Sequence, residues 1–537
     1  MAQHFREPER RQKTLLPADM MEWLPQDDIV HLIVEAVAMI DLSKFEAAYR
    51  VGGAGQAPFA PQLLLALLIY AYSQGVRSSR AIERLCHRDA GYRFIVGDNI
   101  PNHTVIARFR KRHTAEMKVV FLGVLRLCRE AGLVQLSLVA LDGIKVQGNA
   151  SLEASRTTAN IEAEIAKILA EAEATDARED SRPAVQQGAS LPKWLAGKAE
   201  HLARLRRCKE KLERQAAAAA ARQQAKIDAR EAEEQATGKR RRGCKPKAAD
   251  PSIDPHTNAN LTDPDSGIMK TRRGWLQGYN GQIVVTTGQI IVATDANDVQ
   301  QLHPMLAQAQ ANMVAVVDED EQDSVALGAA MADAGYWLEA NVDAETDDCE
   351  LIIATQKDHK QRAALRDALP PRGRKPKHMT ARECMDRKLR TRHGWDRYRR
   401  RGASVEPVFG QMKDRQGARH FSMRGLESCR GEWNLNAAVH NMRKLHSDFV
   451  RRAEKATKRL AERVKKAASS GLLPPQHIFV AKTPCFLPTR PPPTPIPQQA
   501  LEAAEIVRCL AKLATGSSLH AWVFTCWGVC VNRICKV

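Results

Sequence analysis

Apolar residues in the first part of the chain recur with the spacing of amphipathic helices. Between residues 29 and 37 they form one helical face, and Asp27 or Asp28 is in position to cap that helix. A longer apolar run begins at Pro61, which suits a first helical turn, and stops at Gly75, which suits a helix end. The pattern predicts two helices, each with a buried face.

Two further helices are predicted, and the second of them is basic. Ser78 or Ser79 caps a helix that runs through Arg88, and Asn102 or Thr104 caps the next one. The outer side of this last helix is predicted to carry four cations: Arg108, Arg110, Lys111 and Arg112. Short helices ending in a basic one resemble a helix-turn-helix reader, so these residues are candidate DNA contacts. The alternative is a helical subdomain with a solvated charged face.

Farther along, the pattern changes to that of buried strands. Residues 138–141 are continuously apolar and lead directly into Asp142. Gly143 allows a bend, and the alternation of Ile144 and Val146 with polar residues indicates that the strand continues. Apolar runs on both sides of residues 286–288 predict a hairpin, residues 302–313 predict a helix, and residues 350–358 predict another strand. Strands interspersed with helices indicate a mixed α/β core.

Residues 152–236 have a different composition, rich in residues that favour helices. Two apolar stripes run along them, Ile161, Ile165, Ile168 and Leu169 in the first half and Leu202, Leu205, Cys208 and Leu212 in the second. Because residues 180–192 interrupt the pattern, we predict a helical hairpin or coiled-coil arm inserted into the other fold. The basic segment 238–247 is either a phosphate contact or a solvated linker.

Charge and cysteine usage narrow the class of protein. The 537 residues carry a formal net charge of +19, spread along the whole chain, which favours a nucleic-acid partner. The 12 cysteines lack regular spacing, as in proteins kept reduced in the cytoplasm. The N-terminus has no signal-peptide core, and the longest clean apolar run, residues 63–72, is too short to cross a membrane. We therefore expect a cytoplasmic protein.

The C-terminal residues are not expected to belong to the same fold. A Pro-rich run from Thr489 is typical of a linker. The apolar segment 519–535 is interpreted as a tail that packs or aggregates, with a membrane span as the lesser alternative. His520 and the cysteines near it are spaced poorly for a zinc site, so unrelated thiols are the favoured reading.

The stretch from Tyr398 to Lys413 places one carboxylate, Glu406, among cations and aromatic rings. Because Pro407 suits a first helical turn, we predict a loop that gives way to a helix over residues 405–415. Such a helix puts Glu406 and Lys413 on one face. The carboxylate is either half of a surface ion pair or a metal ligand beside a phosphate.

Three acids stand in settings that packing does not explain: Asp142 after a buried strand, Asp333 after a short apolar run, and Glu406 on the basic helix. If they converge, their oxygens form a site suited to Mg²⁺ or Mn²⁺. Two such ions can activate a water or a 3′-hydroxyl for displacement at phosphorus, while nearby cations hold the phosphodiester.

Four segments, taken in order, resemble bacterial insertion-sequence transposases of the DDE type. They are LDGIKVQGNAS, then NLTDPDSGIMK with GYNGQIVV, then ADAGYW, and then YRRRGASVEPVFGQMK with the later RGLE, W and HNMRKL. The resemblance covers about residues 1–450. It implies an α/β, RNase H-like mixed sheet with helices, interrupted by a long helical insertion and preceded by an all-helical N-terminal domain. It also implies cleavage at the element's ends and transfer of the freed 3′-hydroxyl to target DNA.

The resemblance implies roles for particular residues. Asp142, Asp333 and Glu406 would be the catalytic, metal-binding triad and hold two Mg²⁺ or Mn²⁺ ions. Tyr398, Arg401, Glu406 and Lys413 match the family's Y-R-E-K signature, so Tyr398, Arg401 and Lys413 would bind DNA or phosphate.

Two departures from the family pattern leave alternatives. Four residues separate Arg401 from Glu406 where the family usually has three, so Arg399 and Arg400 are the alternatives to Arg401. The acidic run before Asp333 looks longer than usual, and Asp295 and Asp343 are the alternatives to it.

The implied partner is double-stranded DNA, both the terminal inverted repeats and the target. The resemblance also implies further copies of the chain in the DNA complex. It implies a place in the bacterial cytoplasm, at the nucleoid, and no membrane partner. We predict a helical DNA-binding domain over 1–125, a catalytic domain over 130–150 and 255–450, an insertion over 151–254, and a Pro-rich tail over 455–537. Two other functions remain open: a catalytically decayed or domesticated DNA-binding protein, and a structural coiled-coil protein.

Overall fold

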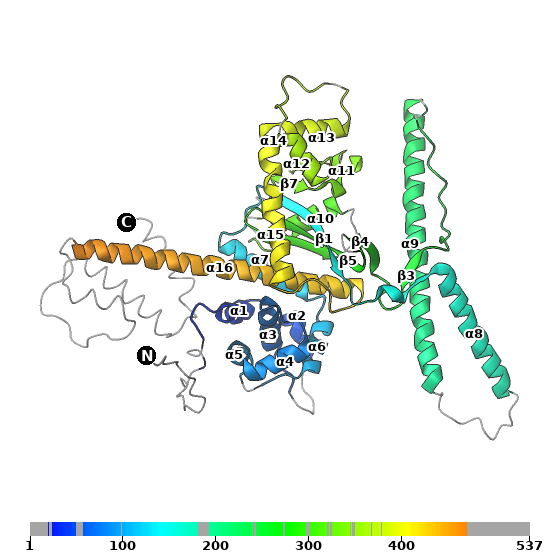
Figure 1. The fold of residues 1–537 in the computed structure, drawn as a ribbon, viewed down its shortest axis with the longest axis horizontal. Coiled ribbons are helices and arrows are strands. Elements are labelled where there is room, and N and C mark those ends of the chain that lie inside the picture. Colours follow the sequence, from blue (N-terminus) through cyan, green and yellow to red (C-terminus); the bar gives the residue numbers. More distant parts are fainter. Residues whose placement is uncertain are drawn as a thin grey trace, which may run out of the picture. The chain divides into compact units, whose positions relative to one another are not determined.

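A computed structural model gives the fold, drawn in Figure 1. The residues that it describes are 20, 24–49, 57–97, 99–180, 193–238, 240, 243–271, 274–296, 301–318, 320, 322, 325–343, 345, 349–366, 368–376 and 378–469. The chain divides into one unit over residues 1–447 and a second over 448–537. The Pro-rich run and the cysteines near His520 lie outside the described residues.

The N-terminal part is helical, as predicted. Its helices are α1 (Ile29–Ala38), α2 (Ser43–Glu46), α3 (Pro61–Ser73), α4 (Ser79–Arg88), α5 (Ala90–Val96), α6 (His103–Arg112) and α7 (Met117–Glu130). Two predicted caps are confirmed, because the Asp28 side chain accepts from Val30 N and the Asn102 side chain accepts from Val105 N. Ser78 is the residue before α4, but its side chain makes no capping hydrogen bond. The apolar faces of these helices belong to the same hydrophobic cluster as the sheet.

A mixed sheet forms the centre of the first unit. Its strands are β1 (Val139–Gln147), β4 (Gly267–Thr271), β5 (Gly274–Thr286), β6 (Ile291–Ala296), β7 (Ala329–Ala332) and β8 (Glu350–Ile353). The order is β4-β5-β1-β7-β8, and β6 also pairs with β5. β5 runs antiparallel to β1, β4 and β6, whereas β1, β7 and β8 are mutually parallel. This is the RNase H-like mixed sheet that the sequence predicts.

One strand boundary agrees with the prediction and another differs. β1 continues through Asp142 to Gln147, as the alternation after Gly143 predicts, and residues 139–147 all pair with β5. β8 ends at Ile353, and Asp358 begins the helix α12 (Asp358–Arg366) instead of ending the strand. The hairpin is confirmed as β5 and β6, and the helix after it is α10 (Leu302–Val314).

The insertion is a helical hairpin. α8 (Thr158–Asp180) packs against α9 (Lys193–Thr237), and a two-stranded sheet of β2 (Ser155–Thr157) and β3 (Asn258–Asn260) lies where the hairpin joins the rest of the chain. Its buried residues are Ile161, Leu205, Cys208, Leu212 and Ala259. Four of these five lie on the two predicted stripes, whereas Leu169, predicted on the first stripe, is exposed.

The part of the chain that follows β7 is again largely helical. After β7 come the short η5 (Ala334–Tyr336) and α11 (Glu339–Asp343), and after α12 come α13 (Ala381–Arg390), α14 (Arg392–Tyr398), α15 (Arg400–Asp414) and the long α16 (Leu426–Ser469). The indole of Trp433 on α16 donates to the carbonyl of Gln282 on β5 at 3.0 Å. Gly281 allows this approach, since a Cβ there would lie 2.8 Å from the Trp433 ring.

The predicted loop before residue 405 is wrong. α15 is already helical at Arg400, so Pro407 lies inside the helix and not in its first turn. A proline in that place has no N–H for the carbonyl four residues earlier, which is that of Ala403. The side-chain amide of Gln289 donates to the Ala403 carbonyl instead, at 3.1 Å.

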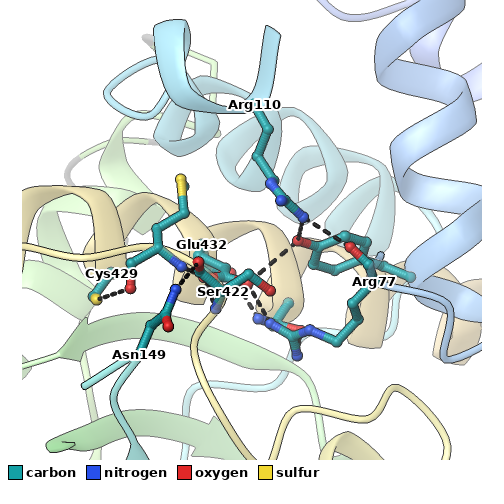
Figure 2. A network of polar contacts seen from close by, with 9 residues as sticks. Arg77, Arg110, Asn149, Ser422, Cys429 and Glu432 are labelled. Carbon is teal, nitrogen blue, oxygen red and sulfur yellow. Dashed lines mark hydrogen bonds and ion pairs between the residues drawn. The ribbon is translucent and has the colours of Figure 1, made fainter. Parts of the chain in front are cut away.

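A buried polar network joins the N-terminal helices to α16 (Figure 2). Glu432 is fully buried, and its Oε1 accepts from Arg77 Nη2 at 2.5 Å. Its Oε2 accepts from the backbone N–H of Ser422 and Met423. Burial opposes ionisation of Glu432, but Arg77 and Arg110 lower the pKa of its carboxyl below the ordinary value. The network therefore holds an ionised carboxylate inside the protein.

Among the described residues, no helix is long and apolar enough to cross a membrane.

Candidate active site

The sheet register brings two of the predicted acids together. β1 and β7 are parallel neighbours in which Val139 pairs with Ala330 and Ala140 with Met331. Continuing this register by two residues places Asp142 opposite Asp333. Because neighbouring strands lie about 4.8 Å apart, the two carboxyl groups are close in space despite the helical arm inserted between them.

Local hydrogen bonds fix both carboxylates. Asp142 Oδ1 accepts from the backbone N–H of Gly143 at 2.7 Å. Asp333 caps η5 and accepts from the backbone N–H of Gly335 at 3.0 Å. Each acid therefore keeps oxygen lone pairs that the backbone does not use.

The pKa of the Asp142 carboxyl is raised above its ordinary value. Burial is the largest cause, Arg401 lowers the pKa and Asp333 raises it, and the result is a pKa of about 6. The side chain is 19% exposed, so it is not sealed from solvent. A buried acid beside a second acid favours a cation as its partner.

Arg401 is the cation that Asp142 contacts. Its Nη1 donates to Asp142 Oδ2 at 2.7 Å, and its Nη2 donates to Asp358 Oδ1 at 3.2 Å. The Arg401 side chain is only 5% exposed. The planar guanidinium thus bridges an acid of the sheet and an acid of α12.

Asp358 was not selected from the sequence. Its Oδ1 also accepts from the Tyr398 hydroxyl at 2.8 Å, and its Oδ2 pairs with Arg362 Nε at 2.9 Å. The signal that singled out Asp142, an acid shortly after a buried strand, is present at Asp358 too. The pattern predicts a strand that extends to Asp358, and this hides the signal.

The sequence-based expectation that Tyr398 contacts DNA does not fit its position. Tyr398 is completely buried, and its hydroxyl is used by Asp358. A ring without exposed surface cannot stack on a base. In the structure, Tyr398 and Arg401 therefore contact carboxylates of the protein and are not open to a phosphate. The predicted substitutes, Arg399 and Arg400, are both exposed.

Glu406 lies on the exposed side of α15. Its carboxyl and the guanidinium of Arg362 both lie beside Gly402, where a Cβ would be 3.1 Å from Glu406 Oε1 and 2.5 Å from Arg362 Nη2. Across the residues that the structure describes, no three His, Cys, Asp or Glu side chains are grouped so as to hold a metal ion. The structure thus pairs Asp142 with Asp333 and does not bring Glu406 into a three-ligand group with them.

The two alternatives to Asp333 are placed elsewhere. Asp295 lies on β6 and is paired with Arg430 at 2.7 Å, across β5 from β1. Asp343 is the last residue of α11. Of the three candidates, Asp333 is the one that lies opposite Asp142 when the register of β1 with β7 is continued.

The predicted basic residues of α6 are divided between surface and interior. Arg108, Lys111 and Arg112 are exposed, as predicted. Arg110 is not on the outer side, because its Nη1 donates to the Tyr72 hydroxyl at 3.1 Å and to the Arg77 carbonyl at 2.9 Å. Its helical position turns it toward the buried network of Figure 2. Lys413 on α15 is partly exposed, and burial lowers the pKa of its ammonium.

The donor set fits a divalent cation in part. Carboxylate oxygens are the ligands that Mg²⁺ and Mn²⁺ prefer, and Asp142 and Asp333 supply them side by side. Because the pKa of the Asp142 carboxyl is raised, a bound cation would stabilise the negative charge of its ionised form. Water ligands commonly complete the shell of Mg²⁺ when a protein supplies one or two carboxylates.

Comparison with known families gives two matches. The family described as transposase domain (DUF772) matches residues 18–112, which include α1 to α6. The family described as transposase DDE domain matches residues 372–446, which include α13 to α15 and the first part of α16. No curated protein matches the chain. No solved structure matches it either.

Proposed function

We propose that this chain, which its two family matches identify as an insertion-sequence transposase of the DDE type, cuts DNA at the element's ends and joins the freed 3′-hydroxyl to target DNA. Transposases act on DNA, and members of the DDE family generally use divalent metal ions. The cleavage and joining steps, the ion and the residues that hold it are the new content of the proposal.

The observation that supports it best is the register that sets Asp142 beside Asp333. Asp142 lies in β1, and Asp333 directly follows the neighbouring parallel strand β7 of an RNase H-like sheet. Arg401, from the matched DDE segment, contacts Asp142 at 2.7 Å. Residues that are far apart in the sequence therefore lie together at one pair of carboxylates.

The residues have separate tasks in this proposal. Asp142 and Asp333 would hold Mg²⁺ or Mn²⁺, with Glu406 as the third ligand supplied by α15. A pair of ions bound there would activate a water or a 3′-hydroxyl and stabilise the leaving oxygen of an in-line displacement. Arg401 orients Asp142, and Lys413 is the proposed phosphate contact from the same helix.

DNA binding is proposed for the N-terminal helices. Arg108, Lys111 and Arg112 present exposed cations on α6, within the segment that matches the first transposase family. Such cations would hold the terminal inverted repeats through their phosphates. The helical arm of α8 and α9 would clamp DNA or pair two copies of the chain in the assembled complex.

The test is strand cleavage of a duplex that carries the element's ends, with and without Mg²⁺. We expect metal-dependent nicking by the wild-type chain and loss of nicking, with retained DNA binding, in Asp142→Asn and Asp333→Asn. Asp414→Asn is the matched control, because Asp414 is an exposed acid on α15 with Arg419 as its partner. Full activity in either variant at the carboxylate pair would contradict the proposal.

A second candidate is a decayed transposase that binds DNA without cutting it. The exposed position of Glu406, outside any three-ligand group of the described residues, favours this reading. The same assay separates the two functions, since a decayed protein would bind the element's ends and fail to nick them at any metal concentration.

A further inference from the structure

The turn between β5 and β6 contains the one described residue other than glycine with a positive φ. Gln289 has a φ of 64°, a conformation that costs energy for a side chain of this kind. The turn closes on both sides of it, since Gln289 N donates to the Thr286 carbonyl and Thr286 N donates to the Ile290 carbonyl, each at 2.9 Å. A residue stays in this conformation only where the contacts around it hold it there.

Gln289 contacts two helices at once. Its side-chain nitrogen donates to the Ala403 carbonyl of α15 at 3.1 Å, and its side-chain oxygen accepts from Lys444 Nζ of α16 at 2.5 Å. Its backbone carbonyl accepts from His440 Nε2 at 2.9 Å. Hydrogen bonds to α16 therefore fix the turn, and the amide that reaches α15 is oriented by Lys444.

The contact with Ala403 replaces a helical hydrogen bond. In an uninterrupted α15, the carbonyl of Ala403 would accept from the N–H of residue 407. That residue is Pro407, which has no N–H. Gln289 supplies the missing donor from the neighbouring hairpin.

This replacement occurs at the turn of α15 that leads to Glu406. Ala403 and Glu406 are three residues apart and lie on the same exposed side of the helix. The turn before them carries Arg401, which contacts Asp142. Asp142 therefore holds one side of this helical segment through Arg401, and Gln289 holds another side through Ala403.

We propose that Gln289 is a positioning residue for the active site, which sets α15, and with it Glu406, relative to the carboxylate pair by donating to the carbonyl that Pro407 leaves without a partner. The inference rests on the function proposed above for Glu406. It assigns Gln289 no contact with DNA or metal.

The test is a cycle of four proteins: wild type, Gln289→Glu, Pro407→Ala and the double variant. Gln289→Glu keeps an oxygen for Lys444 and the length of the side chain but cannot donate to Ala403. Pro407→Ala restores the N–H of residue 407, so that the helix satisfies Ala403 by itself. In the double variant the loss at Gln289 is therefore expected to have no further consequence.

Two readouts follow the cycle. The first is hydrogen exchange of the backbone amides of α15, which needs neither DNA nor metal. We expect exchange in Gln289→Glu to be about fivefold faster than in wild type, as loss of one hydrogen bond of about 1 kcal/mol implies, and to return to the wild-type rate in the double variant. The second is the Mg²⁺ concentration for half-maximal nicking, expected to rise severalfold in Gln289→Glu and to recover in the double variant.

The outcomes are distinct. Unchanged exchange in Gln289→Glu, or loss that Pro407→Ala does not rescue, overturns the positioning role. Rescue of exchange together with an unaltered Mg²⁺ dependence also overturns it, because α15 would then be held without consequence for the site. If the wild-type chain does not nick DNA at all, the proposed function fails, while the exchange cycle still reports on the Gln289–Ala403 contact.

Discussion

Arg401 Nη1 lies 2.7 Å from Asp142 Oδ2, so a residue of α15 contacts the acid at the centre of the sheet. The same guanidinium reaches Asp358 with its other nitrogen. Because both groups are planar and charged, the contact orients Asp142 as well as lowering its pKa. Two segments far apart in the chain are joined at this point.

The bridge predicts that Arg401→Lys is not a conservative change. A single ammonium cannot reproduce the fork that spans two carboxylates. Charge-assisted hydrogen bonds contribute about 1.5–3 kcal/mol, so we expect the single-turnover rate of DNA nicking to fall about 10- to 100-fold. Arg392→Lys, a change at an exposed cation at the start of α14, is the control and should leave the rate unaltered. A wild-type rate in Arg401→Lys would contradict the role of the bridge.

The division of the α6 cations predicts opposite phenotypes for neighbouring residues. Lys111→Ala should weaken DNA binding and reduce the slope of log affinity against log salt by about 1, because one phosphate contact is lost. Arg110→Ala should chiefly lower the melting temperature, because Arg110 donates to Tyr72 and Arg77 inside the protein. Fluorescence anisotropy across a salt series and thermal melts of both variants make the comparison. A salt slope that changes with Arg110 and not with Lys111 would reverse our assignment.

The buried Arg77–Glu432 pair predicts a large effect on stability. Arg77→Met leaves the Glu432 carboxylate buried without its closest cation, and breaking such a pair typically costs about 3–5 kcal/mol. Tyr72→Phe removes the 3.3 Å hydrogen bond to Glu432 and the acceptor of one Arg110 hydrogen bond but keeps the ion pair, so it should cost less, about 2 kcal/mol. Urea denaturation followed by tryptophan fluorescence gives the free energy of unfolding for each. Equal costs in the two variants would show that the ion pair is not the dominant contact.

His440 predicts a loss of stability on acidification. Burial lowers its pKa from 6.5 to about 4, with Gln289 accepting from the ring. The unfolded chain therefore binds more protons between these two values, and the free energy of unfolding decreases as the pH falls from about 6.5 to about 4. The full contribution, about 3 kcal/mol, is present above pH 6.5. Unfolding measured across this range should show a flatter profile in His440→Gln, and an identical profile would contradict the assignment.

Much of the fold could be predicted because its local signals agree. Asp28 and Asn102 act as caps where the sequence indicates, and the stripe that includes Leu205, Cys208 and Leu212 is the buried side of the arm. The apolar residues 139–141 are buried in β1. Such elements depend on periodicity and capping within a few residues, which are visible in one sequence.

The errors arose where a distant residue decides the local structure. Pro407 indicates a helix start by its local preference, yet α15 begins seven residues earlier, and the Ala403 carbonyl that the proline leaves without a donor accepts from Gln289. Arg110 looks like part of a basic face, yet Tyr72 and Arg77 draw it inward. Neither partner can be identified from the spacing of the residues around it.

The candidate site was partly predictable for the same reason. Asp142 and Asp333 each follow an apolar run, which is a local signal, but their alignment depends on the register of β1 with β7. Asp358 carries the same signal and became recognisable only through its contacts with Tyr398 and Arg401. The place of Glu406 in a metal site stays a prediction.

The most direct test of the central claim is a change of metal preference at the carboxylate pair. A thiolate is a softer ligand than a carboxylate and disfavours Mg²⁺ more than Mn²⁺. We expect Asp142→Cys and Asp333→Cys to lose nicking of the element's ends in Mg²⁺ and to regain part of it in Mn²⁺, whereas Asp358→Cys, at an acid that holds Arg401, gains nothing from Mn²⁺. The same activity in both metals for the Asp142 and Asp333 variants, or rescue at Asp358 alone, would show that the pair does not hold the catalytic ion.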